Sequence, residues 1–277
     1  MAVWYLLAAL AGILAGGVVN ALADDLPKRR PVRLPHYPDD LSRPVSAWLG
    51  LTAFLLGQRT SPNGARLSWR YPLTELLTAG LMVLTVYVSQ IRTDVSALQT
   101  VFWCLYMAAM VLITVIDVEH RLILFVVINP LVVLVAIEAL LTPENAAPSL
   151  IDALIGGAAG YIVFFLLFNG GALFTYILGK IRGQPIDEVA FGYGDVMLAG
   201  VSGLMLGWQA LIFSMFITIF LGAFGALIYI AYRRFSPKGY TAFSPIPYGP
   251  YIVIGTLLML LFPSQVSQTF FGALWGA

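Results

Sequence analysis

Apolar residues occur in eight long runs along the chain, separated by polar segments. The runs cover residues 3–23, 72–90, 98–116, 122–141, 150–169, 189–207, 209–232 and 246–262. A helix of about 20 residues crosses the hydrocarbon core of a bilayer, which is about 30 Å thick. The pattern therefore predicts an all-α, polytopic membrane bundle of about eight transmembrane helices. A further apolar piece, residues 47–56, is too short to span, and we expect it to lie at the membrane interface or to pack on the bundle.

The basic residues predict how the bundle is oriented. Four of them closely follow the first apolar run and none precedes it: Lys28, Arg29, Arg30 and Arg33. Cytoplasmic loops of membrane proteins carry an excess of Lys and Arg. We therefore expect the N-terminus to lie outside and the first loop in the cytoplasm. With this topology every Lys and Arg except Arg92 falls on the cytoplasmic side.

This topology divides the chain into three parts. Residues 1–23 form the first transmembrane helix, residues 24–71 form a cytoplasmic loop domain, and residues 72–277 form a membrane-embedded core. No internal repeat is evident in the sequence.

The composition agrees with a membrane protein and excludes several functions. Apolar residues make up 60% of the chain and charged residues only 10%, whereas soluble domains contain about 45–50% and 25%. The net charge of +1 and the few basic residues outside the first loop argue against nucleic-acid binding. Cys104 is the single cysteine, and His36 and His120 are the only histidines. No cysteine-based metal site or catalytic zinc site is therefore expected.

Two of the fourteen acidic residues stand out by position. Asp117 ends the third apolar run and Asp195 opens the sixth, so the topology places both at the cytoplasmic membrane boundary. Two neighbouring carboxylates cannot both ionise, so one holds a proton while the other activates water, as an aspartic protease requires. The alternatives are two unrelated interfacial acids, with Asp195 acting only as a helix N-cap. Glu75, by contrast, is expected in the first turn of the second helix, where an acid complements the helix dipole.

Glycines flank the second aspartate. Gly192 and Gly194 remove side-chain bulk, so that another backbone can lie close to Asp195. Glu188, just upstream, is either a further site residue or a solvated loop acid.

Several motifs resemble the type IV prepilin peptidases, which are GxGD-type aspartic proteases of the inner membrane. The matches, in chain order, are residues 16–20 (GGVVN) with 25–27 (DLP), residues 68–79 (SWRYPLTELLTA), Asp117, residues 192–195 (GYGD) and residues 246–250 (IPYGP). A lone GxGD is shared with presenilin-type proteases, but ordered matches over nearly the whole chain are specific.

The resemblance implies a function and its residues. It implies that Asp117 and Asp195 are the catalytic pair, and that the protein is a multi-pass inner-membrane peptidase. The substrates would be prepilins or pseudopilins, whose short basic leader is cut from a hydrophobic helix. Many members also N-methylate the new N-terminus with S-adenosylmethionine, a cofactor that this chain would need only if it retains that activity.

One departure from the family concerns metal binding. Many members carry two CxxC pairs in the first loop, which hold zinc. The flanking sequence predicts the second pair at Thr60 and Asn63 and the first near Arg30 and Arg33, where no cysteine occurs. Zinc is therefore not expected, and N-methylation is an open question.

Two alternative functions are weighed against prepilin cleavage. One is a presenilin-like intramembrane protease, although its first aspartate usually follows Tyr and here Ile116 precedes Asp117. The other is a non-catalytic membrane scaffold or transporter.

Overall fold

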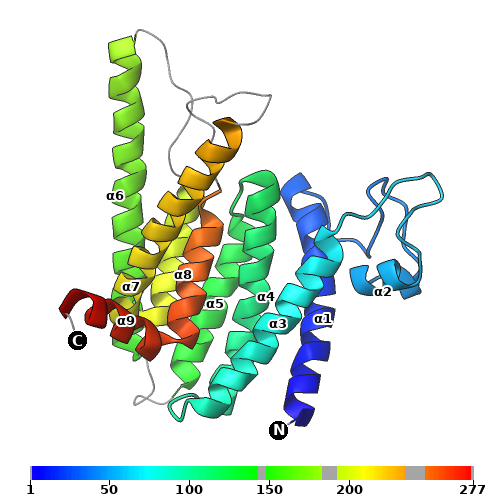
Figure 1. The fold of residues 1–277 in the computed structure, drawn as a ribbon, viewed down its shortest axis with the longest axis horizontal. Coiled ribbons are helices and arrows are strands. Elements are labelled where there is room, and N and C mark those ends of the chain that lie inside the picture. The colour runs from blue at the N-terminus through cyan, green and yellow to red at the C-terminus, as the bar shows by residue number, and fades with distance from the viewer. Residues whose placement is uncertain (1, 143–147, 183–191, 235–246, 276–277) are drawn as a thin grey trace. The chain divides into compact units, whose positions relative to one another are not determined.

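The chain folds into α-helices, with a long loop at about residues 26–69 (Figure 1). The computed structural model describes residues 2–142, 148–182, 192–234 and 247–275, with side chains to residue 269. Its α-helices are α1 (Ala2–Asp25), α2 (Gly50–Leu55), α3 (Arg70–Ile91), α4 (Ala97–His120), α5 (Phe125–Leu141), α6 (Leu150–Arg182), α7 (Tyr193–Arg234), α8 (Gly249–Leu261) and α9 (Pro263–Trp275). Two 3₁₀ turns, η1 (Leu26–Lys28) and η2 (Val45–Ala47), lie in the long loop. The predicted all-α class is confirmed.

Five helices are long and apolar enough to cross a membrane within the described residues: α1, α3, α4, α6 and α7. The pair α8 and α9, bent by 105°, raises the number to six if it is counted as one span. α5 is also apolar but has only 17 residues. The protein is thus a polytopic membrane protein, while the count of eight spans and the side of the N-terminus remain predictions.

The sixth and seventh apolar runs meet at a break inside α7. Gly207 has φ 73° and ψ 166°, a backbone conformation that favours glycine. Asp152 of α6 binds the residue that follows the break. It accepts hydrogen bonds from Trp208 Nε1 at 3.1 Å and from Ser149 Oγ at 2.7 Å. Asp152 lies in the first turn of α6, which begins at residue 150, where the fifth apolar run also begins.

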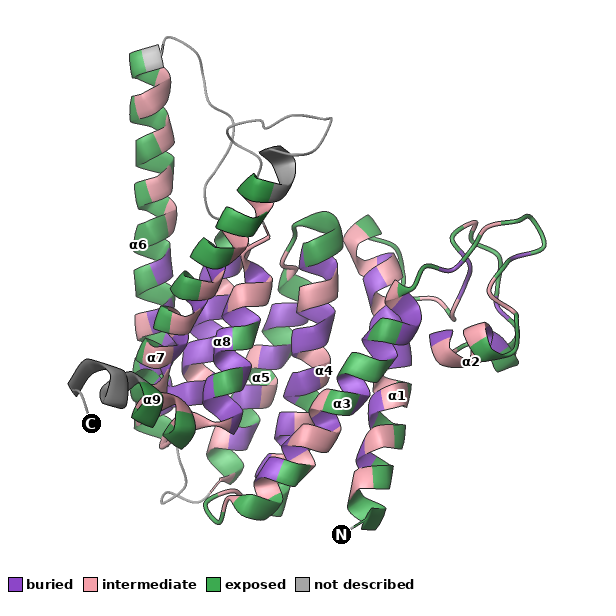
Figure 2. Ribbon diagram, in the orientation of Figure 1, coloured by how far each residue is buried: buried purple, intermediate pink, exposed green. Residues whose placement is uncertain are grey.

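The chain divides into two compact units, Met1–His120 and Arg121–Ala277. In the first unit α1, α3 and α4 pack on one another, and α2 packs on α3. In the second unit α7 packs on α5, α6 and α8. Small residues bring α6 and α7 close together, because a Cβ on Gly160 would overlap the carbonyl of Ala199. Figure 2 shows buried residues on the faces where helices of a unit meet and exposed residues on the outer faces.

The long loop contains two similar turns, residues 36–42 and 60–66. In each, the first and last residues pair in an isolated antiparallel bridge. The second N–H donates to the sixth carbonyl at 2.8 Å, and the fifth N–H donates to the second carbonyl at 2.9 Å. The fifth residue, Asp40 or Gly64, has a positive φ. The loop therefore holds a local repeat with an offset of 24 residues, which the dissimilar side chains conceal in the sequence.

Candidate functional site

Asp195 lies in the first turn of α7, where its carboxylate is fixed by the turn before the helix. Its Oδ2 accepts the backbone N–H of Gly192 at 3.0 Å, and its own N–H donates to the Gly192 carbonyl at 3.1 Å. The residue is only 8% exposed. An acid in the first helical turn is favoured by the helix dipole. Asp195 is thus the third residue of α7 rather than its N-cap, and its carboxylate binds the N–H of the residue before the helix, a role that does not exclude chemistry there.

The two glycines before Asp195 have different surroundings. A Cβ on Gly194 would lie 2.6 Å from Cβ of Ile123 and 3.1 Å from its carbonyl oxygen, so this glycine permits close packing of α7 on the segment before α5. Gly192 is exposed, and among the described residues a Cβ there would meet the Asp195 carboxylate at 3.4 Å and the Gly194 nitrogen at 3.9 Å. Of the two glycines, Gly192 is thus the less crowded by the described residues.

Tyr193, between the two glycines, joins three helices through its ring. Its hydroxyl lies 2.7 Å from the hydroxyl of Tyr161 in α6. Its ring stacks on Phe125 of α5 with centroids 6.1 Å apart, and meets Phe168 of α6 edge-on at 5.9 Å. The first turn of α7 is therefore anchored to α5 and α6, which fixes where the Asp195 carboxylate lies.

Tyr248 is a neighbour of Asp195 that the sequence analysis did not single out. Its ring packs near Phe164 and Tyr251, with centroids 6.5 and 6.0 Å away. Burial, followed by the nearby charge of Asp195, raises the pKa of Tyr248. In the sequence, Tyr248 lies within the family motif at residues 246–250, to which the sequence analysis assigned no role. Residue 246 itself lies outside the described residues.

Asp117 lies three residues before the end of α4, in the first compact unit. It is 5% exposed, and its helix neighbours Ile113 and Ile116 are fully buried. The structure thus places both predicted catalytic aspartates near helix ends, largely withdrawn from solvent. They belong to different units, so their pairing stays a prediction. Glu188 lies outside the described residues.

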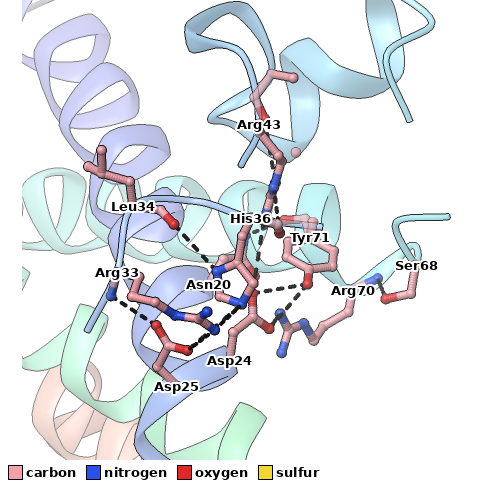
Figure 3. Close-up of polar contacts among 12 residues, drawn as sticks. Asn20, Asp24, Asp25, Arg33, Leu34, His36, Arg43, Ser68, Arg70 and Tyr71 are labelled. Atoms are coloured by element: carbon pink, nitrogen blue, oxygen red, sulfur yellow. Dashed lines mark hydrogen bonds and ion pairs between the residues drawn. The ribbon is translucent and has the colours of Figure 1, made fainter. Parts of the chain in front are cut away.

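A network of charges links the ends of three helices within the first unit (Figure 3). The Arg70 guanidinium at the start of α3 binds Asp24 of α1 and, at 2.9 Å, Glu119 of α4. The Tyr71 hydroxyl donates to Asp24 Oδ2 at 3.0 Å. Because Glu119 follows Asp117 by two residues, this network fixes the helix end that carries the first predicted catalytic residue.

A second set of ion pairs ties the loop to the end of α1. Arg33 binds the fully buried Asp25 at 3.0 Å and the exposed Asp40 at 2.9 Å. Figure 3 shows the Arg33 side chain lying against Asp25. Hydrogen bonds to these two carboxylates raise the pKa of Arg33. Arg33 therefore stabilises the loop, in addition to the effect on membrane orientation that the sequence predicts for the basic residues.

Glu75 has a different partner from the one expected. It lies in the second turn of α3, because the helix begins at Arg70, two residues before the predicted start. Its fully buried carboxylate accepts the backbone N–H groups of Gly50 and Leu51, at the start of α2. Asn20 of α1 donates to it at 3.3 Å. The expectation that Glu75 complements the dipole of its own helix is wrong, because its carboxylate accepts the first N–H groups of α2 instead.

The loop does not offer a zinc site of the kind found in the family. Thr60 and Asn63 are the first and fourth residues of the second turn. The residues at the same places in the first turn are His36 and Asp39, rather than residues near Arg30 and Arg33, where the first cysteine pair was expected. A single ring nitrogen, a carboxylate, a hydroxyl and an amide replace four thiolates. Asp39 Oδ2 instead accepts a hydrogen bond from Ser61 Oγ at 2.6 Å. This direct side-chain contact joins the two turns.

A polar pocket of about 200 Å³ lies where the loop meets the helix ends. Its lining includes Asp24, Lys28, Arg66, Arg70 and Glu119. Sites that enclose a cofactor usually measure about 300–1,000 Å³. Within the described residues, this pocket is too small to enclose S-adenosylmethionine.

Comparisons with known proteins point to one family. The family model described as "Type IV leader peptidase family" matches residues 104–227, a range that contains both predicted catalytic aspartates. A prepilin leader peptidase/N-methyltransferase of Pseudomonas aeruginosa is 29% identical over 215 residues, covering 78% of this chain and 66% of that protein. A protein of the same name from Aeromonas hydrophila is 31% identical over 225 residues, covering 81% and 68%. The chain thus spans about two thirds of the length of these relatives. No solved structure gives a significant match.

Proposed function

Because this chain belongs to the type IV leader peptidase family, we propose that it is a membrane aspartic endopeptidase acting on prepilins or pseudopilins. It removes their short basic leader at the cytoplasmic boundary of the inner membrane. The observation that carries this proposal is Asp195, a buried carboxylate held in the first turn of a membrane helix beside exposed Gly192. Ionisable groups at such places are functional by default, because they are costly there.

The proposed reaction needs two carboxylates that share one proton. The ionised member takes a proton from a water molecule, which attacks the scissile carbonyl carbon. The protonated member donates a hydrogen bond to the carbonyl oxygen, where negative charge develops. Asp117 and Asp195 take these roles in our proposal, titrating as one pair. The leaving amine then receives a proton, and the acid and base forms are restored.

The substrate fits this position in the membrane. A leader is polar and the segment after it is a hydrophobic helix, so the bond between them lies at the membrane boundary. The exposed position of Gly192, which carries no side chain, suits the approach of an extended substrate backbone. The presenilin-like alternative would instead cut inside a helical membrane segment.

The test is cleavage of a purified prepilin by the reconstituted protein. We expect Asp117→Asn and Asp195→Asn each to abolish leader removal while the protein still inserts. Asp94→Asn is the control, since Asp94 is exposed and pairs only locally with Arg92. Normal cleavage by either site variant would refute the aspartic mechanism. Cleavage of a helical membrane substrate without cleavage of prepilin would favour the presenilin-like alternative, and unchanged processing in a strain carrying the double variant would favour a scaffold or transporter.

N-methylation is part of the relatives' printed names and is tested separately. The described loop offers neither a zinc site nor an enclosed cofactor site, so we assign no methyl-transfer step to its residues. Mass spectrometry of a co-expressed pilin reads leader removal and the added mass of a methyl group independently.

A further inference from the structure

One face of the long loop is apolar and exposed. Leu55 at the end of α2 is 83% exposed, Leu56 is 60% exposed and Trp69, just before α3, is 61% exposed. The rings of Phe54 and Trp69 pack together with centroids 4.8 Å apart, which joins α2 to this tryptophan. We call Leu55, Leu56 and Trp69 the α2 face. In a loop surrounded only by water, such a patch would be costly and prone to association.

The α2 face continues onto the outer surface of a membrane helix. Leu73 lies one turn after Trp69 on α3, and Leu76 and Leu77 lie one turn further. All three are at least half exposed, at 59%, 52% and 50%. Residues three or four apart share one face of a helix. The exposed apolar surface therefore runs without interruption from the loop to a surface that faces lipid.

Contacts with α1 and α3 fix how deep α2 lies. Leu49, just before α2, packs where a Cβ on Gly17 of α1 would stand, and Gly50 packs on Tyr71 and Pro72 of α3. Gly17 precedes the end of α1 by eight residues, or roughly 12 Å at 1.5 Å per residue. Figure 1 shows α2 beside the upper parts of α1 and α3 rather than above their ends. The start of α2 thus lies below the level at which α1 ends.

The attachment of α2 is rigid, because it uses a buried carboxylate. Glu75 accepts the Leu51 N–H at 2.8 Å and is itself fully buried. Charge-assisted hydrogen bonds of this kind are stronger than neutral ones. α2 therefore cannot turn its apolar residues inward without breaking them.

We propose that the α2 face is a membrane-interface anchor, embedded in the boundary between headgroups and acyl chains of the leaflet where α1 ends and α3 begins. Amphipathic segments settle about 5–10 Å into this zone, and α2 starts roughly 12 Å along α1 from the end of that helix. Tryptophan is favoured at the same level. Arg59 stacks over both rings, 4.9 Å from Phe54 and 5.9 Å from Trp69, so its guanidinium lies at the rim of the face. A cation there is attracted to anionic headgroups.

The proposal gives the loop a defined function. One side of it is fixed to the bilayer, so the polar pocket and the two turns are held next to the membrane surface. This conclusion does not depend on the peptidase activity, because it rests only on the first compact unit.

The experiment places a fluorophore on the α2 face and measures its depth. In a Cys104→Ser background, Leu55→Cys is labelled with an environment-sensitive probe and the full chain is reconstituted into vesicles of phosphatidylethanolamine and phosphatidylglycerol. The control is Asn63→Cys, on the exposed tip of the second turn. Quenching by lipids that carry a nitroxide near the headgroup end of the acyl chain is compared between the two sites. Leu56→Cys replaces Leu55→Cys if the first variant does not insert.

We expect several-fold stronger quenching, and a blue-shifted emission, for the probe on the α2 face than for the probe at residue 63. Equal quenching at both sites would overturn the proposal. Weak quenching together with efficient cross-linking between two Leu55→Cys chains would also overturn it, since a second copy would then cover the face.

Discussion

Glu75 of α3 accepts the backbone N–H of Leu51 in α2 at 2.8 Å, so an acid in one helix caps another. Glu75 and Leu51 are 24 residues apart in the sequence, and Glu75 is fully buried. This contact determines where the first loop lies against the membrane helices. Substitution of Glu75 tests directly how much this contact contributes to stability.

Replacement of Glu75 is expected to loosen α2. Glu75→Gln keeps the size of the side chain but leaves weaker, neutral hydrogen bonds to Gly50 and Leu51, and Glu75→Ala leaves those N–H groups unsatisfied. Each lost buried partner costs about 1–3 kcal/mol, so the alanine variant should lower the free energy of unfolding more than the glutamine variant. Thermal unfolding of the purified protein in detergent measures both.

Glu119→Gln is the matched control for this test. Glu119 pairs with Arg70 but is 38% exposed, and exposed ion pairs contribute about 0–1 kcal/mol. An equal loss of stability for Glu119→Gln and Glu75→Ala would contradict the special role of Glu75.

Tyr248→Phe is expected to slow leader cleavage. The hydroxyl lies within electrostatic reach of Asp195, and its loss removes a polar group beside a charge that must form during the reaction. We expect a loss of about tenfold in kcat, smaller than the roughly 10²–10⁴-fold typical of a group that itself transfers a proton, with KM nearly unchanged. Tyr251→Phe tests specificity, because Tyr251 packs against Gly225 rather than near the aspartate. Equal effects of the two changes would assign Tyr248 a packing role alone.

Alanine at the two motif glycines should separate packing from substrate access. Gly194→Ala brings a Cβ to 2.6 Å from Ile123, so we expect reduced stability and reduced cleavage together. Gly192→Ala leaves folding intact and raises KM if the substrate backbone passes there. Combining Gly194→Ala with Ile123→Gly should relieve the overlap and restore part of the stability, since it removes the Cβ of residue 123. A double variant no better than Gly194→Ala would contradict this account.

Acidification should weaken the loop through Asp40. The hydrogen bond from Arg33 holds the pKa of the Asp40 carboxyl below its usual range. A carboxylate with a lowered folded-state pKa stabilises the fold above its unfolded pKa, and that stabilisation is lost as pH falls through the folded value. The melting temperature of the wild type should therefore exceed that of Asp40→Asn at neutral pH, and the difference should vanish in strong acid. A difference that persists at all pH values would show that charge is not the cause.

The sequence predicted the helices well because their signal is local. Within the described residues each of the eight apolar runs overlaps an α-helix, and the break between the sixth and seventh runs falls at Gly207. The end of α6 was placed too early, at residue 169, because Asn169 interrupts the apolar run. The helix continues to Arg182, with Asn169 Nδ2 donating to the Phe165 carbonyl at 2.7 Å.

Features that depend on distant partners could not be predicted from the pattern. The aspartates and the family followed from ordered motifs, and the family is confirmed. The partners of Glu75 and Asp195 are set by packing, which no periodicity encodes. The first cysteine pair of the family was expected near Arg30 and Arg33, whereas the turn that resembles residues 60–66 lies at residues 36–42, because the flanking residues do not mark its start.

The hydrogen bond between Asp39 and Ser61 closes the two turns without sulfur or metal. The loop of residues 24–71 contains no thiol that could be oxidised, and we predict that it holds no zinc that a chelator could remove. Its folding should therefore be insensitive to metal starvation and to oxidative stress, conditions that would unfold a zinc-dependent counterpart. The chain could then assemble in cells or envelopes where zinc is scarce.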